Sequence, residues 1–215
     1  MTTEKRVREM GGGRGVVSGW RENVEAVLIA VLLALFIRTF VVQAFKIPSG
    51  SMMDTLLIGD HILVNKFAYG IDVPFLHIPL LDGKKPGRGD VIVFKYPGNP
   101  DKDYIKRVVG LGGDVIAVRD KQLYVNHQPV REGYIIHTES RIEPVRDVFG
   151  PVQVPENCLF VMGDNRDNSS DSRFWGFLEE KAVRGKAFLI YWSWNDQAPS
   201  VSGRVRWSRI GDVIK

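Results

Sequence analysis

Asp90-Val-Ile-Val-Phe-Lys95 and Tyr104-Ile-Lys-Arg-Val-Val109 decide the fold, since both are rich in the β-branched and aromatic residues that favour strands. Between them, Pro97-Gly-Asn-Pro100 has the composition of a turn. Further short segments of the same kind are His61–Phe67, Val115–Val118, Leu123–Asn126, Leu159–Met162 and Ala187–Trp192. Short strands with frequent turns predict a mainly all-β fold, an antiparallel β-sheet domain.

The region between the fifth and sixth of these segments, Leu123–Asn126 and Leu159–Met162, has a different residue pattern. Residues 128–157 show weaker periodicity, and their prolines and glycines stand in turn-like places. We therefore predict a small inserted β subdomain, roughly residues 113–157, between two halves of the main sheet.

An apolar run precedes the strands. Residues 26–37 carry no charge, and the apolar character resumes after Arg38, so that the stretch from Val24 to Phe45 can cross a bilayer of roughly 30 Å. This predicts an N-terminal transmembrane helix over residues 23–45. The upstream segment, residues 1–22, is rich in Lys and Arg, which predicts a cytoplasmic tail and places residues 46–215 outside.

The same run has two other interpretations. A basic segment, a twelve-residue apolar core and Val42-Gln-Ala44 also fit a signal peptide that is cut after Ala44. A buried core helix is the third interpretation, but no polar face interrupts residues 26–37. The sequence leaves the choice between an anchor and a cleaved segment open.

Composition excludes several classes of protein. The 215 residues carry a formal charge of +4, with the basic residues spread out, which favours an anionic membrane surface over nucleic acid as a partner. Cys158 is the single cysteine, which excludes an intramolecular disulfide, and the four histidines lack metal-ligand spacing. We expect no metal site and no nucleic-acid partner.

Three polar motifs stand out against this background. Pro48-Ser-Gly-Ser-Met52 places two hydroxyls beside a glycine, and Gly163–Arg173 is a dense polar stretch after an apolar strand. On the strand Tyr104–Val109, Lys106 shares a face with Tyr104 and Val108. Desolvation on an apolar face would lower the pKa of this lysine. Taken singly, each motif also fits an ordinary turn, loop or exposed strand.

In this order, the motifs resemble those of the bacterial type I signal peptidases (leader peptidases), membrane serine proteases with a Ser-Lys dyad. The matching stretches are Ile47–Met53 with Thr55–Asp60, Arg88–Pro97, Tyr104–Arg107 with Gly110-Leu111, Gly163–Ser169 and Asp171–Gly176. They extend from residue 45 to about 177. Asp54 and Gly112 depart from the family pattern, which commonly has proline at both turn positions.

The resemblance implies a serine endopeptidase that cuts N-terminal signal peptides from exported preproteins without a cofactor. It implies that Ser51 is the nucleophile and Lys106 the general base. The implied supporting residues are Ser49 in the oxyanion hole, Ser169 holding the lysine, and Asp171 with Arg173 as an ion pair. The enzyme would be a single-pass protein of the cytoplasmic membrane, in contact with the lipid bilayer, with its catalytic domain on the outer or periplasmic face.

Family members bind the extended end of a signal peptide as an added strand, with small residues at the first and third positions before the cut. The positions that we predict to contact the substrate are Phe45, Ile47, Pro48, Met52, Leu56 and Ile105. Two alternatives are a non-catalytic anchored β-domain that binds exported chains, and a self-cleaving repressor-like protease. The second would need a DNA-binding helix-turn-helix where the apolar run stands.

Overall fold

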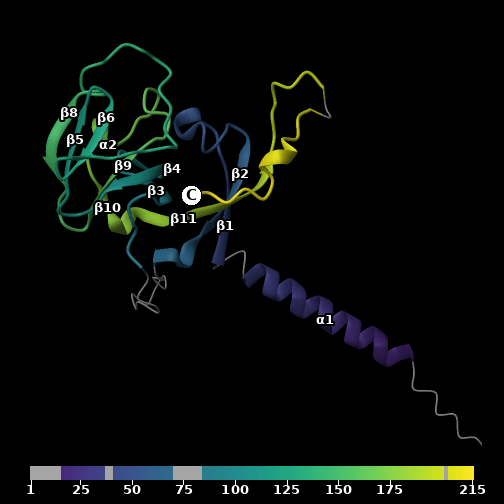
Figure 1. Cartoon of the computed structure of the whole chain (residues 1–215). Helices are drawn as coiled ribbons and strands as arrows, with labels where there is room; N and C mark the ends of the chain where they lie inside the picture. Colours follow the sequence, from purple (N-terminus) through teal and green to yellow (C-terminus); the bar gives the residue numbers. More distant parts are fainter. Residues whose placement is uncertain (1–15, 37–40, 70–83, 201–202) are drawn as a thin grey trace, which may run out of the picture. The chain divides into compact units, whose positions relative to one another are not determined.

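The computed structural model describes residues 16–36, 41–69, 84–200 and 203–215. The chain divides into two compact units, residues 1–39 and 40–215, and each is described by itself. In the first unit, the described residues form helix α1 (Val16–Phe36), drawn in purple in Figure 1.

Large apolar side chains are exposed on every side of α1. The consecutive residues Val27, Leu28 and Ile29 are 57–62% exposed, and together they point around most of the helix circumference. Among the described helices, none combines the length and the hydropathy that a bilayer crossing requires. Residues 1–15 of the predicted tail and residues 37–40 of the predicted anchor lie outside the described residues.

The predicted boundaries of the tail and the anchor need correction. Residues 16–22, assigned to the tail, already belong to α1, and residues 42–45, assigned to the anchor, belong to strand β1 (Val42–Lys46). β1 pairs antiparallel with β2 (Asp60–Asn65), with Val42 opposite Asn65 and Lys46 opposite His61. The reason is that Val and Phe suit a strand as well as a bilayer, and β2 satisfies the backbone of this segment.

The second unit is built on a seven-stranded sheet in the order β1-β2-β11-β3-β4-β9-β10. Its strand pairs are all antiparallel, which confirms the predicted mainly β, antiparallel fold. The remaining strands are β3 (Val91–Tyr96), β4 (Asn99–Gly110), β9 (Cys158–Met162), β10 (Leu178–Glu179) and β11 (Val183–Ser193) (Figure 1).

A second, four-stranded sheet has the order β7-β6-β5-β8 and lies between β4 and β9 in the chain. Its strands are β5 (Val115–Arg119), β6 (Gln122–Val125), β7 (Gln128–Pro129) and β8 (Phe149–Gln153). All four fall inside the range predicted for the insertion. The short helical elements of the unit are η2 (Gly50–Met52), η3 (Lys66–Tyr69), α2 (Ser172–Trp175), η4 (Glu180–Ala182) and η5 (Trp207–Arg209).

The large sheet is covered on both faces at β3. Val91 and Val93 belong to one buried cluster with Met52, whereas Ile92 and Phe94 belong to another. The continuous apolar run of β3 is therefore explained by burial on both sides. Strand β4 lies next to β3, the central strand of the sheet, with Lys106 opposite Ile92. Lys106 therefore lies near the middle of the sheet.

Candidate active site

The loop between β1 and β2 holds Ser51. The amide of Ile47 donates to the Asp60 carbonyl at 2.8 Å, and the amide of Gly59 donates to the Ile47 carbonyl at 3.0 Å, which closes the base of the loop. At its tip, η2 places the Met52 side chain in the core with no exposed surface. Ser51 is thus held on a turn that is fixed by the hydrogen bonds at the base of the loop and by the buried Met52 side chain.

Lys106 of β4 meets this turn. Its Nζ lies 2.7 Å from Ser51 Oγ and donates to the Ile105 carbonyl at 3.0 Å. The residue is only 4% exposed, and Nζ lies 5.4 Å from the centre of the Tyr104 ring. Within the described part of the chain, its amine forms no ion pair with a carboxylate.

Burial lowers the pKa of Lys106 to about 8, against the opposing pull of the Asp171 and Asp164 carboxylates. An ordinary lysine, with a pKa near 10.4, is neutral in well under about 1% of molecules at pH 7–8. With a pKa of about 8, roughly a tenth of the molecules carry the neutral amine at pH 7. A neutral amine beside a hydroxyl can accept the proton of that hydroxyl.

The polar stretch after β9 supports the nucleophile turn from the side. The Asn165 amide donates to the Ser51 carbonyl at 3.1 Å, and its side-chain Nδ2 donates to the Gly50 carbonyl at 3.1 Å. Thr55 Oγ1 donates to Asp164 Oδ2 at 2.6 Å. A Cβ at Gly163 would overlap the Ser51 carbonyl oxygen, so only glycine permits this approach.

The predicted pair of Asp171 and Arg173 is present and buried. Arg173 Nε donates to Asp171 Oδ1 at 2.9 Å, and Nη2 donates to Oδ2 at 2.8 Å. Asp171 also accepts from the Gly163 amide at 3.1 Å. The pair therefore ties the end of the polar stretch to the glycine that contacts the nucleophile turn.

Ser169 and Ser49 have no such partners in the described structure. The Ser169 hydroxyl is buried without a hydrogen bond, so the predicted contact with Lys106 is not formed here. Ser49 precedes η2, is exposed, and its side chain makes no capping hydrogen bond. The roles that the resemblance implies for these two hydroxyls stay predictions.

A buried pair that we did not predict is Arg107 with Asp164. Arg107 Nε donates to Asp164 Oδ1 at 2.9 Å and Nη2 donates to Oδ2 at 2.7 Å, while its guanidinium lies 3.9 Å from the centre of the Tyr134 ring. The sequence feature that could have indicated this pair is an arginine on an apolar strand, on the face opposite Lys106. Such a residue requires an acidic partner, but the sequence does not say which.

The hydroxyl and the amine open into a cavity of about 400 Å³. Its lining residues are Pro48, Ser49, Gly50, Ser51, Asp103, Tyr104, Ile105, Lys106, Asn168 and Ser170. Pro48 and Ile105 were among the residues predicted to contact substrate. Asp103, Tyr104, Asn168 and Ser170 were not, because nothing local in the sequence brings them to this wall.

The other predicted contact residues are buried or partly buried. Ile47, Met52 and Leu56 are at most 2% exposed and form part of the core, and Phe45 packs against the same cluster. We predicted them from nearness to Ser51 in the chain. The turn at η2 presents Ser51 to the cavity and Met52 to the interior, and the substrate contacts predicted for these residues stay predictions.

Among the described residues, no three His, Cys, Asp or Glu side chains are grouped so that they could hold a metal ion. The polar groups that line the cavity include the Ser51 hydroxyl and the Lys106 amine.

Comparisons with known proteins match this chain to signal peptidases. The family model described as "Signal peptidase, peptidase S26" matches residues 20–192. Signal peptidase I of Pseudomonas aeruginosa is 40% identical over 85% of this chain and 75% of its own length, and that of Aquifex aeolicus is 34% identical over 80% and 84%. A crystal structure of a signal peptidase I from Enterococcus faecalis is 34% identical, covering 48% of this chain and 97% of that one, with a TM-score of 0.41.

The resemblance drawn from the motifs is thereby confirmed. The matched range includes both the Ser51 turn and the Lys106 strand, as well as the polar stretch after β9. This chain belongs to the signal peptidase family, peptidase S26.

Proposed function

We propose that this signal peptidase family member cuts the N-terminal signal peptides of exported preproteins with Ser51 as nucleophile and Lys106 as general base. The observation that carries the proposal is the 2.7 Å contact between Lys106 Nζ and Ser51 Oγ at the wall of the cavity. The low pKa of Lys106, about 8, supplies a base near neutral pH.

The first half of the reaction forms an acyl-enzyme. Neutral Lys106 accepts the hydroxyl proton of Ser51 while Oγ bonds to the scissile carbonyl carbon and the carbonyl oxygen gains the negative charge. The ammonium then gives this proton to the leaving nitrogen as the carbon–nitrogen bond breaks. The product with the new N-terminus departs, and Lys106 is neutral again.

The second half uses water. Lys106 takes a proton from a water molecule as its oxygen attacks the ester carbonyl, then returns the proton to Ser51 Oγ as the ester bond breaks. The signal peptide leaves with a carboxylate, and its proton passes to solvent. The water supplies the oxygen of that carboxylate, so atoms and charges balance over the cycle.

The oxyanion would be stabilised by the Ser51 amide and the Ser49 hydroxyl. Ser49 lines the cavity, and the absence of a capping bond supports its availability to a substrate. Loss of one such donor typically costs about 2.7–4 kcal/mol of transition-state stabilisation.

Substrate binding would use the edge of the large sheet. β1 is an edge strand, and it leads directly into the loop that carries Ser51. An extended peptide can therefore add a strand beside it, with the small residues of a signal peptide's end in the cavity. The cavity volume of about 400 Å³ is shared between backbone and side chains, which favours small residues.

We also propose that α1 belongs to a single-pass membrane anchor, with the catalytic domain on the outer face. The exposed apolar side chains around α1 support this, because lipid is the environment that favours them. The described part of the helix is by itself not long and apolar enough to cross a bilayer, and residues 37–40 of the predicted anchor lie outside the described part.

The test is cleavage of a purified preprotein in detergent by the wild type, Ser51→Ala and Lys106→Ala. We expect the wild type to cut after the small-residue site and both variants to lose cleavage while keeping the fold. If a folded Lys106→Ala variant cuts at the wild-type rate, the dyad is wrong. If the folded wild type binds the preprotein without cutting, the binding-domain alternative takes its place.

A further inference from the structure

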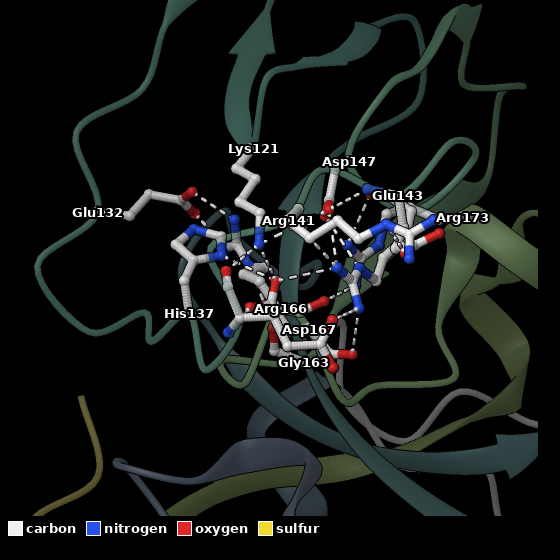
Figure 2. Close-up of polar contacts among 12 residues, drawn as sticks. Lys121, Glu132, His137, Arg141, Glu143, Asp147, Gly163, Arg166, Asp167 and Arg173 are labelled. Carbon is white, nitrogen blue, oxygen red and sulfur yellow. Dashed lines mark hydrogen bonds and ion pairs between the residues drawn. The ribbon is translucent and has the colours of Figure 1, made fainter.

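The hairpin between β5 and β6 carries an unusual turn. Asp120 and Lys121 at its tip have φ angles of 48° and 70°, the left-handed region that such two-residue turns use and that glycine and asparagine favour. Lys121 adopts it although it has a long side chain. That side chain points away from its own sheet, into the polar cluster of Figure 2.

Lys121 is enclosed by oxygen atoms. Its Nζ donates to the Glu139 carbonyl at 2.6 Å and to Asp167 Oδ1 at 2.9 Å, and lies 3.7 Å from Asp147 Oδ2. Its side chain is 13% exposed, and those of Asp147 and Asp167 are 1% and 0% exposed. An ammonium in such a site interacts far more strongly than one on the surface.

Asp167 is the centre of this cluster. Besides Lys121, it accepts from the Glu139 amide at 2.8 Å and faces His137 Nδ1 at 3.1 Å (Figure 2). Burial alone would raise the pKa of Asp167, yet these hydrogen bonds and the Lys121 charge hold it well below its usual range. Arg146 adds a contact from Nη1 to the Asp167 carbonyl at 3.2 Å.

Asp167 also belongs to the polar stretch that supports the nucleophile turn. The residues just before it contact the Ser51 turn through Asn165, and those just after it, Asn168 and Ser170, line the cavity. A carboxylate fixed at this point fixes the loop on both sides of it. Lys121, the cation nearest to this carboxylate, comes from the turn between β5 and β6, 46 residues away in the chain, and Arg146 Nη2 lies 3.9 Å from the same oxygen, Asp167 Oδ1.

We propose that Lys121 is a positioning residue for peptide cleavage, through which the inserted sheet holds the loop at residues 163–171 against the nucleophile turn. It touches neither the substrate nor the reacting atoms. This inference rests on the proposed Ser51–Lys106 site, because the loop matters for the rate only if that site performs the chemistry.

The experiment compares the wild type with Lys121→Met and Lys121→Arg in the full chain, cutting a preprotein in detergent. Met keeps most of the length and removes the charge, whereas Arg keeps the charge. For Lys121→Met we expect kcat to fall about 10- to 100-fold, the effect of a displacement of about 1 Å near the reacting groups. KM should stay within about threefold, and Arg should restore most of kcat.

Two controls separate positioning from a loss of fold. Lys85→Met removes an ammonium that is 70% exposed and pairs with Glu180, and it should leave kcat unchanged. The pH midpoint of cleavage by Lys121→Met should stay near the wild-type value, since the base is intact. Hydrogen exchange at residues 164–170 should increase in Lys121→Met and not in Lys85→Met.

If Lys121→Met does not fold, the double variant Lys121→Met/Asp167→Asn removes both charges and avoids an unpaired buried carboxylate. It should fold and still lose kcat at least tenfold. A folded single or double variant with wild-type kcat overturns the positioning role. Ser51→Ala in the same assay keeps the two hypotheses apart, because its full activity would refute the proposed site and not the ion pair.

Discussion

Lys106 and Lys121 are both withdrawn from solvent, but they lie in opposite electrostatic surroundings. Lys106 contacts a hydroxyl and a carbonyl, and its pKa is lowered to about 8. Lys121 contacts the carboxylate of Asp167 and lies near that of Asp147. Burial without a paired carboxylate makes a lysine a base, whereas burial with one makes it a structural cation.

The comparison also explains why each carboxylate near Lys106 forms an ion pair with an arginine. Asp164 and Asp171 both raise the proton affinity of Lys106, and both are bound by buried guanidinium groups. Arg107 and Arg173 thus compete for the carboxylates that would otherwise hold the lysine charged. Acidic side chains lie near the site, but within the described residues none of them forms an ion pair with Lys106.

The largest effect is expected for Lys106→Met. Cleavage should fall by about 10⁴-fold or more, since the nucleophile loses its base. At the same time, the free energy of unfolding at pH 7 should rise by about 1–3 kcal/mol. The measurements are kcat/KM and denaturant unfolding.

The sign of that stability change follows from the pKa values. Lys106 titrates at about 8 in the folded chain and near 10.4 in the unfolded one. Below pH 8 both states are protonated and the folded state bears the cost of the buried charge, which disappears as the pH rises from about 8 to 10. Lys106→Met should therefore lack the gain of stability in that window, and a variant less stable than the wild type at pH 7 would contradict this.

A smaller effect is expected for Gly163→Ala, which tests the contact between the loop and the nucleophile turn. The added methyl would overlap the Ser51 carbonyl and the Ser169 side chain, so one of them must move. We expect kcat to fall about 100-fold. Gly133→Ala is the matched control, because a Cβ there meets nothing within 4 Å, and a Gly163→Ala variant as active as this control would show that the close packing is dispensable.

Cleavage by the wild type should rise with pH. Below the Lys106 pKa of about 8, the rate should fall about tenfold for each pH unit, because the neutral amine falls in that proportion. The measurement is kcat/KM from pH 5.5 to 9.5. A rate that is flat between pH 6 and 8 would contradict a lysine base.

The smallest effect is expected for Asn168→Asp. This substitution adds a carboxylate near Lys106, so that its electrostatic surroundings become more like those of Lys121. Asn168 is exposed and lines the same cavity as Lys106. A carboxylate there should raise the midpoint of the pH profile by about 0.5 unit, and salt should reduce the shift. Asn168→Ala should leave the midpoint in place, and equal midpoints for both variants would contradict the electrostatic explanation.

The sequence indicated most of the large sheet, because strands such as β3 and β11 are rich in the β-branched and aromatic residues that favour strands. It did not separate β1 from the apolar run before it, since valines suit both. It identified Ser51 and Lys106 through motifs, but not the Lys121–Asp167 pair, which joins residues 46 positions apart. Pairing across that distance depends on the fold and leaves no local pattern.

The turn of η2 separates neighbouring side chains. Nearness to Ser51 suggested Met52 and Leu56 as pocket residues; both are completely buried in this structure, and their contact with substrate stays a prediction. In one turn of helix, neighbouring side chains point in different directions, so adjacency in the chain does not imply a shared surface. The cavity wall is made by residues 48–51 together with residues from β4 and from the loop after β9.

The most direct test is to titrate the Lys106 amine itself. The folded chain with isotope-labelled lysine side chains would be followed by NMR from pH 6 to 11, and the Lys106 signal assigned by its absence in Lys106→Met. The proposed dyad predicts a midpoint of about 8. A midpoint near 10.4, the value of an ordinary lysine, would mean that Lys106 stays charged at neutral pH and cannot be the base.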